Sequence, residues 1–288
     1  MMGEVSIAEA QQLGVARLQQ AGFDLSSAQF DTQKLLEQVM NCSAGFLFTY
    51  PETRLSRDQQ ELFEQLIASR CEGMPVAYLL GEVGFWRLQL RVNPFTLIPR
   101  PDTELLVTTA LAVMAQHNQS YPNVLDLGTG TGAIALALAQ ERPHWAIRGY
   151  DRVPEAVALA QENAHLNGLD GVQFSCQDWR QALPEWPCDL ILSNPPYIDA
   201  HDPHLLQGDV RHEPLSALVA EDSGLADLKQ VIACATELLR PFGYLLLEHG
   251  FEQGEAVHQL LHAAGFQKVL AEYDLQGHWR VSGGQWLG

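Results

Sequence analysis

Hydrophobic residues in the first quarter of the chain recur at the three- and four-residue spacing of helices that bury one face. Ser56 and Gln59 form a capping box ahead of the third such group. Gly22 and the run Tyr50-Pro51-Glu52-Thr53 are turn signals between the groups. The pattern predicts a small helical bundle over residues 1–75. The apolar positions of the three groups are Ala10, Leu13, Ala16 and Leu18; Phe30, Leu35, Leu36 and Val39; and Leu62, Phe63, Leu66 and Ile67.

Residues 76–100 change to an alternation of apolar and polar positions, which is typical of a strand with one buried face. Gly84–Val92 alternates in this way, and Asn93-Pro94 is a turn signal. Phe95–Ile98 is then the expected return strand. We therefore predict a β-hairpin that links the helical bundle to the rest of the chain.

From residue 101 to residue 288, short apolar runs alternate with segments of helical periodicity. Helices are expected from Thr131, from Pro154, around Leu225–Leu239 and from Glu252. This alternation predicts an α/β fold, with a mostly parallel sheet and helices on both faces. Ligands bind such a sheet outside the carboxyl ends of its strands. The expected strands are Val124–Leu127, Ala146–Tyr150, Val172–Ser175, Leu190–Leu192, Tyr244–Leu247 and Lys268–Tyr273.

Length and charge narrow the classes of function. A chain of 288 residues exceeds a typical single domain, and a hydrophobic fraction of 47% is ample for a sizeable core. Asp and Glu number 35 against 17 Lys and Arg, which gives a net charge of −18. Proteins that hold duplex nucleic acid through its phosphates usually carry a basic surface. We therefore expect no direct nucleic-acid partner.

The five cysteines are scattered and form no CxxC pair, and no histidine-rich cluster accompanies them. The sequence thus supports neither a disulfide framework nor a metal site, and it fits a reducing, cytoplasmic compartment. Met1–Leu18 lacks the long apolar run of a signal peptide. No segment reaches the run of about 18 apolar residues that suggests a membrane span, so we expect no membrane partner.

A glycine-rich run joins the first expected strand to its helix: Gly128-Thr129-Gly130-Thr131-Gly132. Glycines allow a tight turn and a close approach of backbone to ligand, and the helix that follows offers free N–H groups. The spacing is GxGxG rather than the GxGxxG of dinucleotide-binding proteins. Taken alone, the run is a weak signal, because a simple tight turn between a strand and a helix also explains it.

The next strand ends also carry ligand-type residues. Asp151 ends the second strand, where an acidic side chain accepts hydrogen bonds from ribose hydroxyls. Asp178 and Trp179 follow the third strand, where a carboxylate and a ring can flank an adenine. Asn194 ends the fourth. Asp151 by itself is more often a helix cap, but the three strand ends together predict a nucleoside pocket at one edge of the sheet.

The run Asn194-Pro195-Pro196-Tyr197 follows a buried strand. Its two prolines donate no backbone hydrogen bonds and have a fixed φ, so the turn is stiff. It presents carbonyl oxygens, an amide side chain and an aromatic ring. Such a turn suits a flat group with an NH2, which needs acceptors and a stacking face.

These motifs carry a family resemblance. Residues 101–288 resemble the class I S-adenosylmethionine-dependent methyltransferases, in which the glycine-rich run and Asp151 look like the first two motifs. The whole chain resembles the PrmC/HemK family of protein-(glutamine-N5) methyltransferases of peptide-chain release factors. The stretches that carry this closer resemblance are Gly73–Tyr78, Gly81–Trp86, Leu97–Glu104, Arg211–Pro214 and Leu246–Gly250, together with Asn194–Tyr197.

The resemblance implies a methyltransferase domain with a Rossmann-like, mostly parallel seven-stranded sheet, preceded in the chain by a small helical-bundle domain. Residues 1–75 would bind class I release factors at their GGQ domain, 76–100 would be the β-hairpin linker, and 101–288 would be the methyltransferase domain. The cofactor would be S-adenosyl-L-methionine, no metal would be needed, and we expect a monomer. The expected cofactor-binding residues are Gly128, Thr129, Gly130, Thr131, Gly132, Asp151, Trp179 and Asn194.

The implied reaction transfers a methyl group to the side-chain nitrogen of the glutamine in the GGQ motif. The expected catalytic residues are Asn194, Pro195 and Tyr197, and the whole turn, Pro196 included, would contact the substrate. By hypothesis, the Asn194 side-chain oxygen and the Pro195 carbonyl each accept one N–H of the amide, while the Tyr197 ring packs on it. Three further residues are secondary candidates that a structural role explains at least as well: Glu104, Glu213 and Glu248.

Three other functions are alternatives, and a feature of the sequence disfavours each of them. An N6-adenine methyltransferase of DNA or RNA also needs a pocket for a flat NH2, but base-flipping enzymes need a basic cleft. A non-catalytic cofactor-binding adaptor is disfavoured by the intact Asn194 and Tyr197. An NAD-dependent dehydrogenase is disfavoured by the GxGxG spacing. The tripeptide Gly283-Gly284-Gln285 matches the substrate motif of release factors, and chance is our preferred interpretation of that match.

Overall fold

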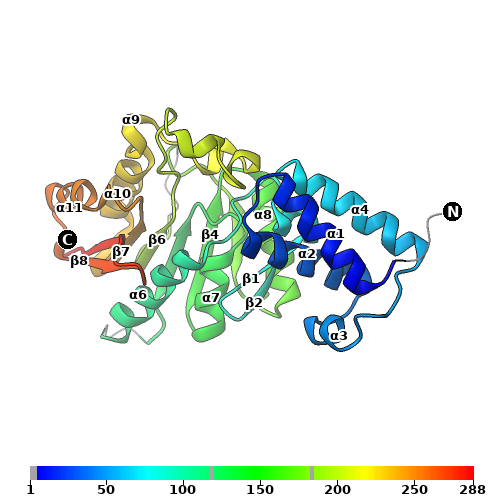
Figure 1. Cartoon of the computed structure of the whole chain (residues 1–288). Helices are drawn as coiled ribbons and strands as arrows, with labels where there is room; N and C mark the ends of the chain where they lie inside the picture. The colour runs from blue at the N-terminus through cyan, green and yellow to red at the C-terminus, as the bar shows by residue number, and fades with distance from the viewer. Residues whose placement is uncertain (1–4, 117–119, 182–184) are drawn as a thin grey trace. The chain divides into compact units, whose positions relative to one another are not determined.

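A computed structural model of the chain describes residues 5–116, 120–181 and 185–288 (Figure 1). The first four residues of the predicted helical bundle lie outside this description. The chain divides into two compact units. One, the helical unit, comprises Met1–Gly81 and Gly208–His212. The other, the α/β unit, comprises Glu82–Gln207 and Glu213–Gly288.

The helices of the helical unit begin at side-chain caps. Ser6 and Glu9 form a capping box before the first helix, and the Asp24 carboxylate accepts a hydrogen bond from the Ser27 N–H before the second. The predicted capping box of Ser56 and Gln59 is confirmed at the fourth. Each cap satisfies N–H groups that have no partner within the helix. The helices are α1 (Ile7–Gln20), α2 (Leu25–Met40), α3 (Ala44–Thr49), α4 (Arg57–Cys71) and α5 (Val76–Leu80).

The buried face of α1 differs from the expected one. Leu13 is 57% exposed, whereas Gly14 is buried against α2. A Cβ at Gly14 would lie 2.7 Å from the Thr32 methyl group, so only glycine allows the two helices to approach this closely. A search for large apolar side chains overlooks such a contact, which explains the error. The residues that α1 buries are Ile7, Ala10, Gly14 and Leu18.

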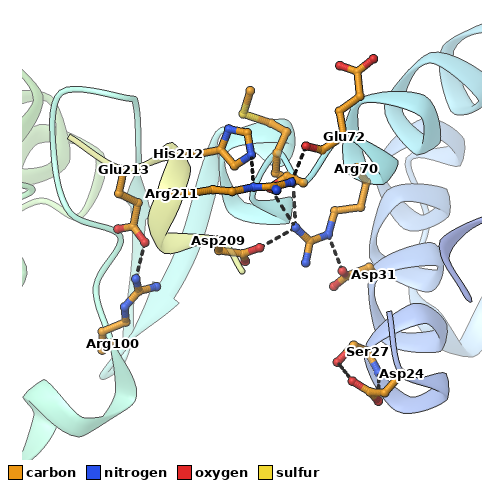
Figure 2. Close-up of polar contacts among 12 residues, drawn as sticks. Asp24, Ser27, Asp31, Arg70, Glu72, Arg100, Asp209, Arg211, His212 and Glu213 are labelled. Carbon is orange, nitrogen blue, oxygen red and sulfur yellow. Dashed lines mark hydrogen bonds and ion pairs between the residues drawn. The ribbon is translucent and has the colours of Figure 1, made fainter. Parts of the chain in front are cut away.

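A buried arginine organises the polar interior of the helical unit. Arg70, in the last turn of α4, is 5% exposed. Figure 2 shows its guanidinium between two carboxylates: Nε donates to Asp31 at 2.6 Å and Nη1 donates to Asp209 at 2.6 Å. Nη1 also donates to the Met74 carbonyl, and the guanidinium stacks on the Phe23 ring at 4.3 Å. The segment Gly208–His212 therefore joins this unit through a charge pair that is distant in sequence.

The predicted hairpin forms, but its turn lies earlier in the sequence than expected. Strands β1 (Glu82–Phe85) and β2 (Leu88–Arg91) pair antiparallel around a two-residue turn at Trp86, whose φ is +56°. The Glu104 carboxylate accepts the Trp86 backbone N–H at 2.7 Å. The expected return strand Phe95–Ile98 is irregular instead. Because the turn is held by a residue 18 positions away, local alternation alone does not reveal it.

The α/β unit is built on seven strands in the order β5-β4-β3-β6-β7-β9-β8, which confirms the expected sheet. All neighbours are parallel except β9, which runs antiparallel to β7 and β8. The strand order reverses between β3 and β6, and ligands bind at such a switch point. The strands are β3 (Asn123–Leu127), β4 (Ala146–Asp151), β5 (Gln173–Cys176), β6 (Cys188–Ser193), β7 (Leu239–Glu248), β8 (Gln267–Tyr273) and β9 (Trp279–Gln285).

Helices cover both faces of this sheet (Figure 1). Successive side chains of a strand point to opposite faces. Accordingly, Leu190 and Leu192 of β6 join the cluster under the helices α6 to α8, whereas Ile191 joins the cluster under α10 and α11. These helices are α6 (Glu104–Ala115), α7 (Ala133–Glu141), α8 (Pro154–Leu166), α10 (Ala226–Leu238) and α11 (Gly254–Ala263); α9 (Glu221–Gly224) is a short turn.

Strand β9 was not located by the sequence pattern. It contains Gly283-Gly284-Gln285 as a buried segment between β7 and β8, and the Gln285 side chain donates to the Phe242 carbonyl at 3.1 Å. A Cβ at Gly283 would lie 2.5 Å from the Leu245 carbonyl oxygen. The glycine is thus required by close strand packing, which gives the tripeptide a structural role. Among the described residues, no helix combines the length and apolarity needed to cross a bilayer.

Candidate active site

A cleft in the α/β unit opens at the carboxyl ends of β3, β4 and β6. Its floor comes from the glycine-rich turn after β3 and from the start of α7. Its walls come from irregular segments on either side of the sheet edge. The residues that line it are Phe95, Thr96, Leu97, Pro99, Thr103, Gly128–Thr131, Ala133, Ile134, Asp151–Val153, Trp179, Arg180, Asn194, Pro196, Ser216, Ala217 and Asp227.

The glycine-rich turn is tied to the neighbouring strand by backbone hydrogen bonds. The N–H groups of Gly128 and Thr129 both donate to the Tyr150 carbonyl, at 2.9 and 3.0 Å. Gly128, Gly130 and Gly132 have positive φ, which disfavours other residues there. Gly132 caps α7, and the Phe174 ring would lie 3.0 Å from a Cβ there. Its role is therefore to seat the helix, and it does not line the cleft.

Asp151 is the last residue of β4, and its carboxylate binds both the glycine-rich turn and the segment that follows β4. Its Oδ2 accepts the Gly130 N–H at 2.9 Å, and its Oδ1 accepts the Val153 N–H at 3.0 Å. Burial raises the pKa of this carboxyl, against the opposing effect of the two N–H donors. Each carboxylate oxygen has a second lone pair, so hydroxyl groups of a ligand can also donate to it.

A second carboxyl, Asp126, lies below the turn and is fully buried. Its Oδ2 accepts the Thr129 hydroxyl at 2.7 Å, and its Oδ1 has no hydrogen-bond partner among the described residues. Burial, with a smaller contribution from the charge of Asp151, raises its pKa to about 7. Asp126 therefore supports the turn from within and does not contact the cleft.

Of the pair after β5, only the tryptophan lines the cleft. Asp178 is turned to Arg180, which donates to both of its carboxylate oxygens, at 2.9 and 3.0 Å. This ion pair lowers the pKa of Asp178. The expectation that the Asp178 carboxylate flanks the ligand is therefore wrong, whereas the Trp179 ring forms part of the wall.

The turn after β6 brings its amide side chain into the cleft. The Asn194 Nδ2 donates to the Thr103 hydroxyl at 3.2 Å. Pro196 also lines the cleft, whereas Pro195 is buried and Tyr197 is not among the lining residues. The Tyr197 hydroxyl points to the Glu248 carboxylate at 3.5 Å, and burial raises the pKa of this phenol. The Tyr197 carbonyl accepts a hydrogen bond from the Gln253 side chain at 2.9 Å.

A strap, residues 95–103, which ends in a short 3-10 helix at Pro101–Thr103, closes one side of the cleft. The buried carboxylate of Glu213 accepts the Ile98 N–H at 2.9 Å and pairs with the Arg100 guanidinium (Figure 2). One of the secondary candidates, Glu213, thus holds the strap in place through Ile98 and Arg100. A second, Glu104, supports the hairpin turn instead.

The structure brings most of the predicted site residues together and adds others. Gly128, Thr129, Gly130, Thr131, Asp151, Trp179, Asn194 and Pro196 share the cleft, whereas Gly132, Pro195 and Tyr197 are not among the residues that line it. Sequence reasoning missed the cleft residues of the strap and of the short 3-10 helix Leu215–Ala217, because irregular segments and single helical turns carry no periodicity. It also missed Thr103, for which the only sequence signal is its place in the stretch 97–104.

The arrangement fits a nucleoside. Acceptors at Asp151 face a wall of apolar and aromatic side chains, which suits ribose hydroxyls beside a flat base. The indole N–H of Trp179 is buried without a partner among the described residues. The Asn194 oxygen is an acceptor at the far end of the same cleft. The described residues include no group of three or more His, Cys, Asp or Glu side chains that could hold a metal ion.

Comparison with known families assigns both parts of the chain. A family model described as "Methyltransferase domain" matches residues 118–277. A second, described as "PrmC N-terminal domain", matches residues 9–81. Together they span the larger part of both units.

Curated relatives extend this similarity to the full length. A protein of Shewanella oneidensis named "Release factor glutamine methyltransferase" is 46% identical over 288 residues, which cover 100% of this chain and 99% of that protein. One of the same name from Pseudomonas aeruginosa is 52% identical over 263 residues, covering 91% and 94%. A solved methyltransferase structure from Pyrococcus furiosus shares the fold, with a TM-score of 0.50 at 17% identity over 70% of this chain and 89% of that chain.

Proposed function

The chain belongs to the release factor glutamine methyltransferase family, and from that membership we propose that the turn Asn194–Tyr197 holds the glutamine side chain that is methylated. The enzyme transfers a methyl group to the amide nitrogen of a glutamine in a peptide-chain release factor. The methyl donor is S-adenosyl-L-methionine. What the turn and its neighbours contribute follows from their geometry.

The difficulty of the reaction lies in the nucleophile. An amide nitrogen attacks poorly because its lone pair is delocalised into the carbonyl. In our proposal the Asn194 Oδ1 and the Pro195 carbonyl each accept one N–H of the substrate amide. Fixing both hydrogens turns the nitrogen lone pair toward the methyl group and stabilises the positive charge that develops on nitrogen. The amide nitrogen takes the methyl group directly from the donor sulfur, whose bond to the methyl group breaks, and releases one proton to solvent. This direct transfer requires neither a nucleophilic side chain nor a covalent enzyme intermediate.

The other cleft residues are assigned to the cofactor. When bound, S-adenosyl-L-methionine supplies a methyl group on a positively charged sulfur. We assign Asp151 to the ribose hydroxyls, the Trp179 wall to the base, and the turn Gly128–Thr131 to close backbone contact. These residues fit the group, because acceptors, a flat wall and a glycine turn occur together in one cleft.

One observation carries the proposed role of the turn. The Asn194 Nδ2 is engaged by Thr103 inside the protein, so its Oδ1 is the atom left to face a ligand. An acceptor is needed for an NH2 group, and it stands in the same cleft as the proposed cofactor-binding residues.

The experiment compares the labelling of two candidate substrates. Purified protein is incubated with methyl-labelled S-adenosyl-L-methionine and either a release factor or duplex DNA. We expect label on the glutamine of the GGQ motif, located by peptide mass spectrometry, and none on DNA. Label on adenine, with none on the release factor, would replace this proposal by the N6-adenine alternative.

A variant at Asp151 tests the cofactor assignment. Asp151→Ala removes the acceptor for the ribose and also frees the Gly130 N–H. Loss of charge-assisted hydrogen bonds costs about 1.5–3 kcal/mol each, so we expect the Kd for S-adenosyl-L-methionine to rise by at least about tenfold. Calorimetric titration measures this Kd. Asp170→Ala, which removes an exposed carboxylate that pairs with His165, is the control. An unchanged Kd in Asp151→Ala would refute the assignment.

We further propose that the helical unit recognises the release factor and that the enzyme works as a cytoplasmic monomer. Large apolar side chains are exposed on this unit, among them Phe48 at 89% and Phe30 at 56%. Their exposure on a unit that matches the PrmC N-terminal domain supports this role. The net charge of −18 disfavours direct contact with nucleic acid.

A further inference from the structure

A buried carboxylate lies directly behind the proposed substrate acceptor. Glu248 is the last residue of β7 and is 2% exposed. In the parallel pairing of β6 with β7, Ser193 lies opposite Leu247, so the next residues, Asn194 and Glu248, leave the sheet side by side. Glu248 is not among the residues that line the cleft. It can therefore act on a substrate only through a neighbour.

Three polar side chains of the described part of the chain that lie near this carboxylate, those of Tyr197, Thr103 and Asn194, can each donate a hydrogen bond. The Tyr197 hydroxyl lies 3.5 Å from Oε1, and the side chains of Thr103 and Asn194 lie close enough to favour the charged form of Glu248. Oε2 has no partner in good hydrogen-bonding geometry among the described residues. A carboxylate accepts but cannot donate, so these neighbours must turn their hydrogens toward it.

This requirement fixes the direction of the Asn194 amide. An asparagine side chain can rotate to exchange its oxygen and its NH2. A hydroxyl such as that of Thr103 can either donate or accept and by itself tolerates both orientations. If Thr103 gives its hydrogen to the carboxylate, its oxygen is left to accept from the Asn194 Nδ2, which it does at 3.2 Å. The Asn194 oxygen is then directed outward.

We propose that Glu248 is a positioning residue that keeps the Asn194 oxygen facing the substrate amide, a role that rests on the proposed function of the turn. The ionised carboxylate fixes the direction of two consecutive hydrogen bonds, which we call the relay. The Thr103 hydroxyl donates to Glu248, and the Asn194 Nδ2 donates to the Thr103 oxygen. Without the ionised carboxylate, the amide can present its NH2 to the substrate, and two NH2 groups then oppose each other.

The relay gives the enzyme a pH dependence. Burial raises the pKa of Glu248 to about 7, while Thr103, Arg280 and Asn194 oppose this effect and Asp102 adds to it. The phenol of Tyr197, with its pKa raised by burial, stays neutral near that pH. The adjacent His249 turns to Ser282, and burial lowers its pKa. Above pH 7 Glu248 is an acceptor; below it, the protonated acid can donate to Thr103 and the polarity is lost. Activity is therefore expected to rise with pH through about 7.

The test is Glu248→Gln, which keeps the shape and removes the buried charge. With a release factor as substrate, kcat is expected to fall about ten- to a hundredfold, as when the hydrogen-bond partner of a functional side chain is removed. The Kd for S-adenosyl-L-methionine should stay within about twofold, which also shows that the cleft is folded. The rise of kcat near pH 7 should disappear.

Asp126→Asn is the matched control, because Asp126 is the other fully buried carboxyl of this unit whose pKa is raised to about 7. This variant should keep the rise of kcat near pH 7. If it loses the rise, or if Glu248→Gln keeps both the rise and the wild-type kcat, the positioning role is wrong.

A second measurement needs no turnover. The side-chain NH2 resonances of Asn194, identified by their loss in Asn194→Ala, should shift with a midpoint near pH 7 in the free enzyme. They should not do so in Glu248→Gln, and an identical titration in both proteins would overturn the relay. Failure of the wild-type enzyme to label a release factor would instead count against the proposed function, since the NMR titration does not depend on any substrate.

Discussion

Replacing Asn194 with alanine is expected to lower kcat for release-factor methylation by about 10²–10³-fold, the usual cost of losing one group preorganised for charge that develops in the transition state. This corresponds to about 3–4 kcal/mol of transition-state stabilisation. The variant removes the side-chain oxygen that we assign to one substrate N–H. The amide then keeps only the Pro195 carbonyl as an acceptor, and its lone pair is no longer oriented.

The change should fall on turnover more than on cofactor binding, because Asn194 is only one of many residues that line the cleft. Single-turnover rates and calorimetric titration with S-adenosyl-L-methionine separate the two effects. Asn123→Ala is a suitable control, since Asn123 lies at the amino end of β3, away from the cleft, and its side chain donates to the Pro187 carbonyl. Turnover within threefold of wild type in Asn194→Ala would rule out the proposed acceptor.

The site residues that could be predicted from the sequence are those that directly follow buried strands. Parallel strands leave the sheet at one edge, so residues that follow buried apolar runs must meet there. This reasoning placed Gly128, Asp151, Trp179 and Asn194 in one cleft. It misjudged Asp178, because the competing partner Arg180 sits two residues away and satisfies the carboxylate locally.

Features that depend on long-range contacts could not be predicted in this way. The hairpin turn at Trp86 is held by Glu104, and the cleft strap is clamped by Glu213, which is 115 residues from Ile98. Strand β9 contains two glycines, which have low strand propensity. They are tolerated there because the neighbouring strands leave no room for a Cβ. In each case the deciding partner lies far away in sequence.

The polar interior of the helical unit also depends on partners that lie far apart in sequence, because Arg70 binds both Asp31 and Asp209. Arg70→Met is expected to lower the free energy of unfolding by about 3–5 kcal/mol, because it leaves the buried Asp31 carboxylate without its partner. Typical domains are stable by only about 5–15 kcal/mol, so this is a large fraction of the total. Urea unfolding followed by far-UV circular dichroism measures the loss. All six Trp residues lie in the α/β unit, so their fluorescence reports on that unit separately.

Two further variants distinguish the loss of an ion pair from the cost of leaving a buried carboxylate without a partner. Arg57→Met removes an exposed arginine paired with Glu61 and should cost no more than about 0.5 kcal/mol. In the double variant Arg70→Met with Asp31→Leu, most of the lost stability should return, because burial raises the pKa of Asp31 even beside the guanidinium. Desolvation therefore outweighs attraction at this carboxylate, and an apolar pair avoids both. A double variant no more stable than Arg70→Met would show instead that the hydrogen bonds of Arg70 to Asp209 and Met74 carry the stability.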